Sequence, residues 1–128
     1  MERMQKEVTT STPWGRADMV TPYGRGINFY TTPAHGGFKL SEKLNALVPE
    51  YFRNAAFAGL GLKGWYEEDC DWAIVAVVFP SFFNDAEIKL ANESLERYLP
   101  AEYAAFKAGH RFSVNPGAEF ARRIPDTK

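Results

Sequence analysis

The chain has 128 residues, which is a typical length for one domain, and a hydrophobic share of 45%, which is enough for one buried core. Its formal net charge of −1 gives no general attraction to nucleic acid or to an anionic membrane surface. The single cysteine excludes an internal disulfide and a zinc site made of cysteines.

The N-terminal residues are charged and no apolar run follows them, so we expect no signal peptide and a cytoplasmic protein. The longest apolar run, residues 72–79, is far too short to span a membrane. Residues 1–12 are polar and lack hydrophobic periodicity. This predicts a flexible arm, followed by a single domain over residues 13–128.

Two segments rich in β-forming residues come next, residues 17–21 and residues 27–32. Between them, residues 23–26 contain two glycines that can take a positive φ in a turn. The pattern predicts a β-hairpin. Because an isolated hairpin is only marginally stable in water, we expect it to pack on another part of the chain.

The segment after the hairpin contains the pair Gly36-Gly37, which allows a sharp bend or a close approach of the backbone to a neighbour. Ser41 can cap a short helix over residues 42–47. Residues 50–63 are apolar but irregular, and they indicate no regular element.

The most apolar part of the chain lies between Gly64 and Pro80, with no helix breaker inside it. We favour one helix of about four turns. Four acids would then lie in its first turns, where the helix dipole favours anions: Glu67, Glu68, Asp69 and Asp71. The alternative is that residues 74–79 form a buried strand, since Ile and Val suit strands. Trp72 begins the apolar run and is predicted to be buried.

Residues 84–87 form a capping-box pattern ahead of a helix whose apolar residues share one face. Pro100 suits the first turn of a second short helix over residues 101–107, and Gly109 is expected to end it. The tail from His110 onward is expected to pack back only in part. Together the elements predict an α+β fold, with an N-terminal β-hairpin packed on a small bundle of three to four helices.

Several motifs resemble a known group of proteins. They are Thr-Pro-Trp-Gly at residues 12–15, His-Gly-Gly-Phe-Lys-Leu-Ser at 35–41, and Trp-Tyr-Glu-Glu-Asp-Cys-Asp-Trp-Ala at 65–73. In these motifs the chain resembles small proteins of unknown function carried by bacteriophages and conjugative plasmids, over roughly residues 11–100. The resemblance implies a mobile-element protein, and such proteins often act against host defence systems. It implies no reaction.

The acidic cluster and His35 are the candidate sites. The cluster is a helix N-terminus, a carboxylate site that holds a divalent cation together with His35, or an acidic patch that docks a basic partner. His35 is a general base or a residue that only holds the hairpin exit. As a binding surface we predict a set of six residues: His35, Phe38, Tyr66, Glu67, Glu68 and Asp69. As a catalytic alternative we predict His35, Glu68 and Asp71.

We expect a non-enzymatic phage or mobile-element protein that inhibits a host defence complex, such as CRISPR–Cas, by protein–protein contact. The high content of aromatic residues fits such an interface. The partner would be a host protein or ribonucleoprotein complex, without direct contact to nucleic acid or membrane and without a cofactor or tightly bound metal. The alternative is a small acid/base or metal-assisted enzyme. An enzyme should have His35 within hydrogen-bond reach of a carboxylate in a cleft, whereas a binder should have exposed aromatics and no hollow around His35.

Overall fold

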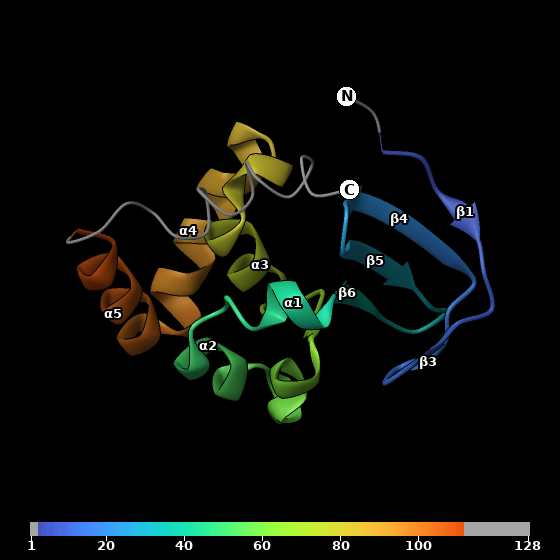
Figure 1. The fold of residues 1–128 in the computed structure, drawn as a ribbon, viewed down its shortest axis with the longest axis horizontal. Helices are drawn as coiled ribbons and strands as arrows, with labels where there is room; N and C mark the ends of the chain where they lie inside the picture. Colours follow the sequence, from blue (N-terminus) through green and yellow to red (C-terminus); the bar gives the residue numbers. More distant parts are fainter. Residues whose placement is uncertain (1–2, 112–128) are drawn as a thin grey trace.

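A five-stranded antiparallel sheet lies beside a group of helices in the computed structural model, which describes residues 3–111 and their side chains to residue 109 (Figure 1). The expectation for the tail concerns residues that lie almost wholly outside this range. None of the described helices is long and apolar enough to cross a membrane.

The sheet has the strand order β1-β4-β5-β6-β7, and a separate two-stranded ribbon pairs β2 with β3. The strands are β1 Lys6–Glu7, β2 Ser11–Thr12, β3 Gly15–Arg16, β4 Met19–Gly24, β5 Ile27–Thr31, β6 Gly36–Leu40 and β7 Trp65–Glu67. The predicted hairpin is confirmed as β4 and β5, with Gly26 at φ 85° in the turn. The glycine pair does not bend the chain but begins β6, where Gly37 pairs with Tyr30.

Seven helical segments complete the described part of the chain. They are α1 Glu42–Asn45, α2 Glu50–Ala55, the 3₁₀ helix η1 Phe57–Lys63, α3 Trp72–Val78, the 3₁₀ helix η2 Pro80–Phe82, α4 Asp85–Tyr98 and α5 Pro100–Arg111. Ser41 caps α1 as predicted, and Asn84 and Glu87 form the predicted capping box of α4. Helix α5 begins at Pro100, but it continues through Gly109 to Arg111, so the predicted end is wrong.

The stretch from Gly64 to Pro80 is neither one long helix nor a strand. Its first part is strand β7, residues 68–71 form a turn, and only then does helix α3 begin. The helix prediction is therefore confirmed for residues 72–78, and the alternative of a strand there is wrong. Helix α3 has Asp71 at its N-cap and no acid in its first turn, so the predicted placement of four acids in the first turns of one helix is wrong.

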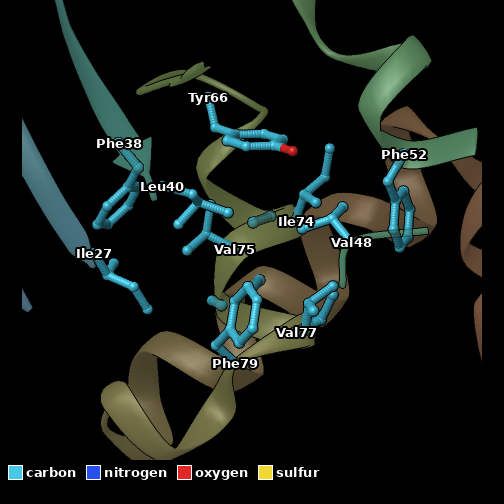
Figure 2. Packing of buried hydrophobic residues seen from close by; sticks show 14 of the residues in the cluster. Ile27, Phe38, Leu40, Val48, Phe52, Tyr66, Ile74, Val75, Val77 and Phe79 are labelled. Carbon is cyan, nitrogen blue, oxygen red and sulfur yellow. The ribbon is translucent and has the colours of Figure 1, made fainter. Parts of the chain in front are cut away.

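Helix α3 lies at the centre of the core. Its residues from Ala73 to Val78 are all buried, because the sheet and α4 cover it from different sides. Figure 2 shows Ile27 and Leu40 of the sheet near Val75 of this helix. The fold class α+β is thus confirmed, but the predicted hairpin is only part of a larger sheet. Trp72 is half-buried at the start of α3, which corrects the prediction that it is a core residue.

A buried polar network joins three elements of the core. The Tyr66 hydroxyl donates to Oδ1 of Asn45 over 2.5 Å, and Nδ2 of Asn45 donates to the carbonyl of Gly61 over 2.8 Å. Burial raises the pKa of Tyr66. Because buried polar groups are costly when unpaired, this network fixes β7 against α1 and η1.

The N-terminal segment lies along the sheet. Strand β1 pairs with β4, and Arg3 forms an ion pair with Glu87 at the start of α4, with Nη2 and Oε1 3.0 Å apart. The division into a flexible arm of residues 1–12 and a domain of residues 13–128 stays a prediction, since these contacts do not measure mobility.

The outer face of the sheet carries an aromatic cluster. The rings of Trp14 and Trp65 meet at 90° with centroids 5.6 Å apart, and Tyr30 lies 5.8 Å from Trp65. Trp14 covers Gly37, where an added Cβ would overlap Cη2 of the indole and lie 2.6 Å from the carbonyl oxygen of Tyr66. The glycine therefore allows the close approach that the sequence indicated.

We predict that Gly37→Ala destabilises the protein by about 1–3 kcal/mol, because the methyl group meets both an indole ring and a backbone oxygen. The measurement is the free energy of unfolding from urea denaturation. Gly109→Ala is the control, since an added Cβ there meets no atom of the described residues within 4 Å beyond its own helix backbone, and alanine favours the helix by about 1 kcal/mol. Equal effects of the two substitutions would contradict the packing of Trp14 on Gly37.

Candidate functional site

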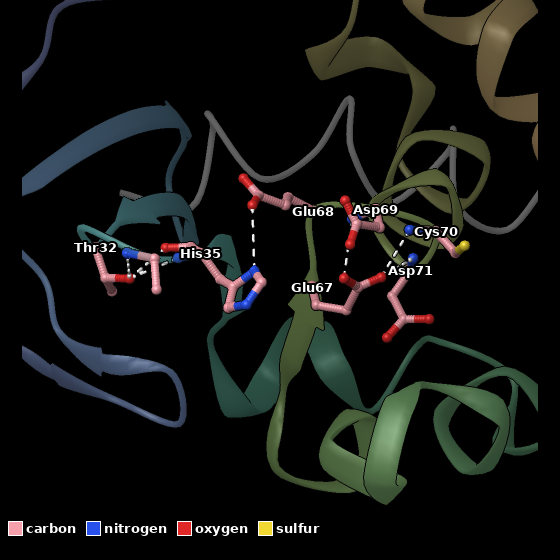
Figure 3. Close-up of polar contacts among 8 residues, drawn as sticks. Thr32, His35, Glu67, Glu68, Asp69, Cys70 and Asp71 are labelled. Carbon is pink, nitrogen blue, oxygen red and sulfur yellow. Dashed lines mark hydrogen bonds and ion pairs between the residues drawn. The ribbon is translucent and has the colours of Figure 1, made fainter.

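Residues 67–71, which we call the acidic turn, connect β7 to α3 and contain all four acids of the predicted cluster. Figure 3 shows that their side chains point in different directions, so the cluster does not form one group of carboxylates. Glu67 and Asp71 accept hydrogen bonds from backbone amides, whereas Glu68 and Asp69 are exposed, so the four acids separate into structural and exposed ones.

Glu67 holds the acidic turn in shape. Its carboxylate accepts hydrogen bonds from the backbone N–H groups of Asp69, Cys70 and Asp71, over 3.0, 2.7 and 3.3 Å. Hydrogen bonds to a charged acceptor contribute about 1.5–3 kcal/mol each in favourable geometry. The carboxylate therefore satisfies backbone N–H donors that precede α3, and its hydrogen bonds stay within its own turn.

Asp71 anchors the other end of the turn inside the protein. Only 5% of the residue is exposed, and Oδ2 accepts a hydrogen bond of 2.7 Å from the backbone N–H of Phe57 in η1. Burial raises the pKa of Asp71 to about 6, and the negative charge of Glu67 adds to this rise, although the hydrogen bond from Phe57 opposes it. Asp71 thus joins η1 to α3 and does not reach the surface.

The turn between β5 and β6 positions His35. Oγ1 of Thr32 accepts from the backbone N–H of His35 over 2.9 Å, and the same hydroxyl donates to the carbonyl of His35 over 2.5 Å. The imidazole Nδ1 lies 3.8 Å from Oε2 of Glu68, as the dashed line in Figure 3 marks. This separation is an ion-pair distance but longer than a hydrogen bond.

A hollow of about 380 Å³ lies beside His35, and its lining includes Trp14, Phe57 and Cys70. Glu67 and Asp69 also line it. The Cys70 thiol is a poor nucleophile there, because burial raises its pKa and the neighbouring carboxylates raise it further. The expectation that a binder lacks a hollow around His35 is therefore wrong. Among the described residues, His35 also forms no hydrogen bond with a carboxylate, which was expected of an enzyme.

No three His, Cys, Asp or Glu side chains in the described part of the chain are placed to hold one metal ion. The proposed cation site with His35 does not assemble in this geometry, because the carboxylates of Glu67 and Asp71 face backbone amides. Glu68 is the one acid of the turn that faces His35.

Two residues of the predicted binding surface lie in the core. Phe38 is 2% exposed and Tyr66 is 0% exposed, so their side chains do not reach a partner at the surface. Both alternate with outward residues on their strands, and the sequence could not indicate which face was inward before the register was known. Glu68 and Asp69 are exposed, and Glu67 is half-buried.

The sequence reasoning did not identify Trp14 and Phe57, which lie beside His35, or Glu87, which binds Arg3. Phe57 is 64% exposed, which is unusual for so large an apolar side chain. A single sequence indicates neither which residues lie beside His35 and Arg3 nor that Phe57 is exposed, because both depend on contacts between distant segments.

The fold and the site define a small α+β domain in which a meander of strands carries an acidic turn over a buried helix. The chain belongs to a family described as a domain of unknown function (DUF7007), which matches residues 7–125. Neither a curated protein nor a solved structure matches the chain.

We predict that Asp71→Asn removes a pH-dependent part of the stability. The folded pKa of Asp71, about 6, lies above the usual value of 3.8, so the folded state binds this proton more tightly than the unfolded state. Its contribution to stability is therefore complete below about pH 4 and is lost as the pH rises through 6, for a total of about 3 kcal/mol.

The measurement is the free energy of unfolding of wild type and Asp71→Asn from pH 4 to pH 7. The variant should gain on the wild type as the pH rises, since the amide still accepts from Phe57 without carrying a buried charge. Asp69→Asn, which removes an exposed carboxyl of the same turn, is the matched control. A difference between wild type and Asp71→Asn that stays constant with pH would refute the prediction.

Proposed function

We propose that the protein is a non-enzymatic binding protein that acts by contact with a basic surface of a protein partner. The observation that carries the proposal is that the four acids of the acidic turn have two different roles. Glu67 and Asp71 fix the backbone, and this presents the exposed carboxylates of Glu68 and Asp69 at the surface. Preordered charges of one sign accelerate and orient association with a complementary partner.

Aromatic side chains next to the turn support the same proposal. Phe57 is 64% exposed and lines the same hollow as Asp69 and the half-buried Trp14. Protein interfaces are enriched in aromatic residues at their centre and are polar at their rim. An aromatic hollow with carboxylates at its edge has this composition.

We also propose a specific biological setting for this binding. The motifs at residues 35–41 and 65–73 resemble those of small phage and plasmid proteins, and we propose an inhibitor of a host defence complex such as CRISPR–Cas. The partner would be a host protein or ribonucleoprotein complex in the cytoplasm. In a ribonucleoprotein the acidic turn would face a basic protein surface, since carboxylates repel the nucleic acid itself.

The enzyme alternative has weaker support. His35 lines a hollow, but its nearest carboxylate is 3.8 Å away, and both side chains are well exposed, at 58% for His35 and 38% for Glu68. An exposed ion pair of this kind contributes at most about 1 kcal/mol and does not fix the imidazole. Asp71, the third catalytic candidate, is buried against Phe57.

The test begins with affinity capture from host lysate and mass spectrometry to identify the partner, and the interaction is then titrated with purified components. We expect an effect stoichiometric with the target. His35→Ala should keep it, whereas Glu68→Lys/Asp69→Lys should slow association by about tenfold or more at low salt. Added salt should have the same effect on the wild type.

Glu96→Lys is the control, because this exposed acid lies on α4 and lines neither the turn nor the hollow. It should associate like the wild type. Turnover by a catalytic amount of protein that His35→Ala alone abolishes would overturn the binding proposal, and an equal loss with Glu96→Lys would remove the acidic turn from it.

A further inference from the structure

A small aromatic cleft lies between the sheet and the start of helices α3 and α4. It has a volume of about 180 Å³. Its lining includes five rings, of which Tyr23, Phe29 and Trp72 are half-buried and Phe38 and Phe83 are buried. Several of these rings pack edge to face, for example Tyr23 and Phe38 at 82° with centroids 4.8 Å apart. Two carboxylates, those of Glu68 and Glu87, complete the lining.

The chain itself shows which chemistry these groups bind. The guanidinium of Arg3 lies 3.8 Å from the ring centroid of Tyr23, and its Nη1 and Nη2 donate to the two oxygens of Glu87 over 3.1 and 3.0 Å. Nη2 also donates to the carbonyl of Phe82 over 2.9 Å. Stacking on a ring combined with a two-pronged ion pair is the characteristic recognition of arginine.

Arg3 lines a neighbouring hollow and is not part of the lining of the cleft. The hollow that contains Arg3 shares Tyr23 and Phe83 with the cleft, so the same two rings line both spaces. Tyr23 and Glu87 thus already contact one guanidinium, that of Arg3, and both residues also line the cleft.

Hydrogen-bonding capacity remains at both carboxylates. Oε1 of Glu87 accepts from Arg3 and from the backbone N–H of Asn84, but the only hydrogen bond that the described residues give to Oε2 comes from Arg3. The carboxylate of Glu68 has only the 3.8 Å contact with His35 among the described residues. Since a carboxylate oxygen accepts about two hydrogen bonds, a cation in the cleft would find acceptors at both ends.

We propose that the aromatic cleft between Glu68 and Glu87 binds one arginine side chain of a protein partner. The proposal deepens the function proposed above and rests on it for the partner. The cleft is smaller than the 300–1,000 Å³ of usual small-molecule sites, so one side chain suits it better than a substrate. A planar guanidinium can stack on the rings and pair with a carboxylate at once, which the ammonium of lysine does less well.

The test uses Nα-acetyl-arginine methylamide as the probe and the full chain as the receptor. Binding is followed by NMR through the side-chain resonances of Trp72 and Phe29. We expect a Kd of about 1–10 mM, as for one ion pair and one ring contact. The citrulline analogue, which has nearly the same shape without the charge, should not bind, and the lysine analogue should bind more weakly.

Glu68→Gln should weaken arginine binding by about fivefold or more, while Glu96→Gln on the outer part of α4 should leave it unchanged. The proposal is overturned if citrulline binds as well as arginine, if Glu68→Gln acts no more strongly than Glu96→Gln, or if Trp72 and Phe29 do not shift. These outcomes need no partner. If the arginine probe does not bind, the titration of the acidic-turn variants still tests the proposed function. If that titration shows catalytic turnover, the probe experiment still decides whether the cleft binds arginine.

Discussion

The carboxylate of Glu67 reverses the chain between β7 and α3 by accepting three backbone N–H groups. Without this carboxylate, the amides before α3 would depend on water as a hydrogen-bond partner where the chain leaves the sheet. The reversal brings the apolar run of α3 under the sheet, and this positions the core that Ile27 and Leu40 complete. Asp71 then ties the start of the helix to Phe57, so two acids of the turn are structural.

The same turn creates the candidate interaction surface. Because its backbone is held by Glu67, the side chain of Glu68 lies between His35 on one side and the aromatic cleft on the other. Arg3 pairs with Glu87, which also lines the cleft. Thus an acidic patch, a hollow and a cleft meet at one short connection, whose backbone amides are bound by Glu67.

The sequence predicted those elements whose signals are local. The β4–β5 hairpin depends on Gly26, and the start of α4 depends on the capping pair Asn84 and Glu87, so neighbours in the chain decide both. The division of residues 64–80 into strand, turn and helix was missed, because long-range pairing of β7 with β6 overrides the continuous apolar pattern. The site was predicted only in part for the same reason. His35 and Glu68 do meet, but Tyr66 could not be assigned to the core before its strand register was known.

Amide hydrogen exchange tests the role of Glu67 most directly. In Glu67→Ala, the N–H groups of Asp69 and Cys70 should exchange at least about tenfold faster, because each tenfold corresponds to 1.4 kcal/mol and a hydrogen bond to a carboxylate exceeds this. The amide of Phe29 in the sheet serves as the internal reference for global unfolding. Glu68→Ala should leave the exchange of the turn as in the wild type. Equal exchange rates in the two variants would contradict the claim that Glu67 holds the turn and Glu68 is available for binding.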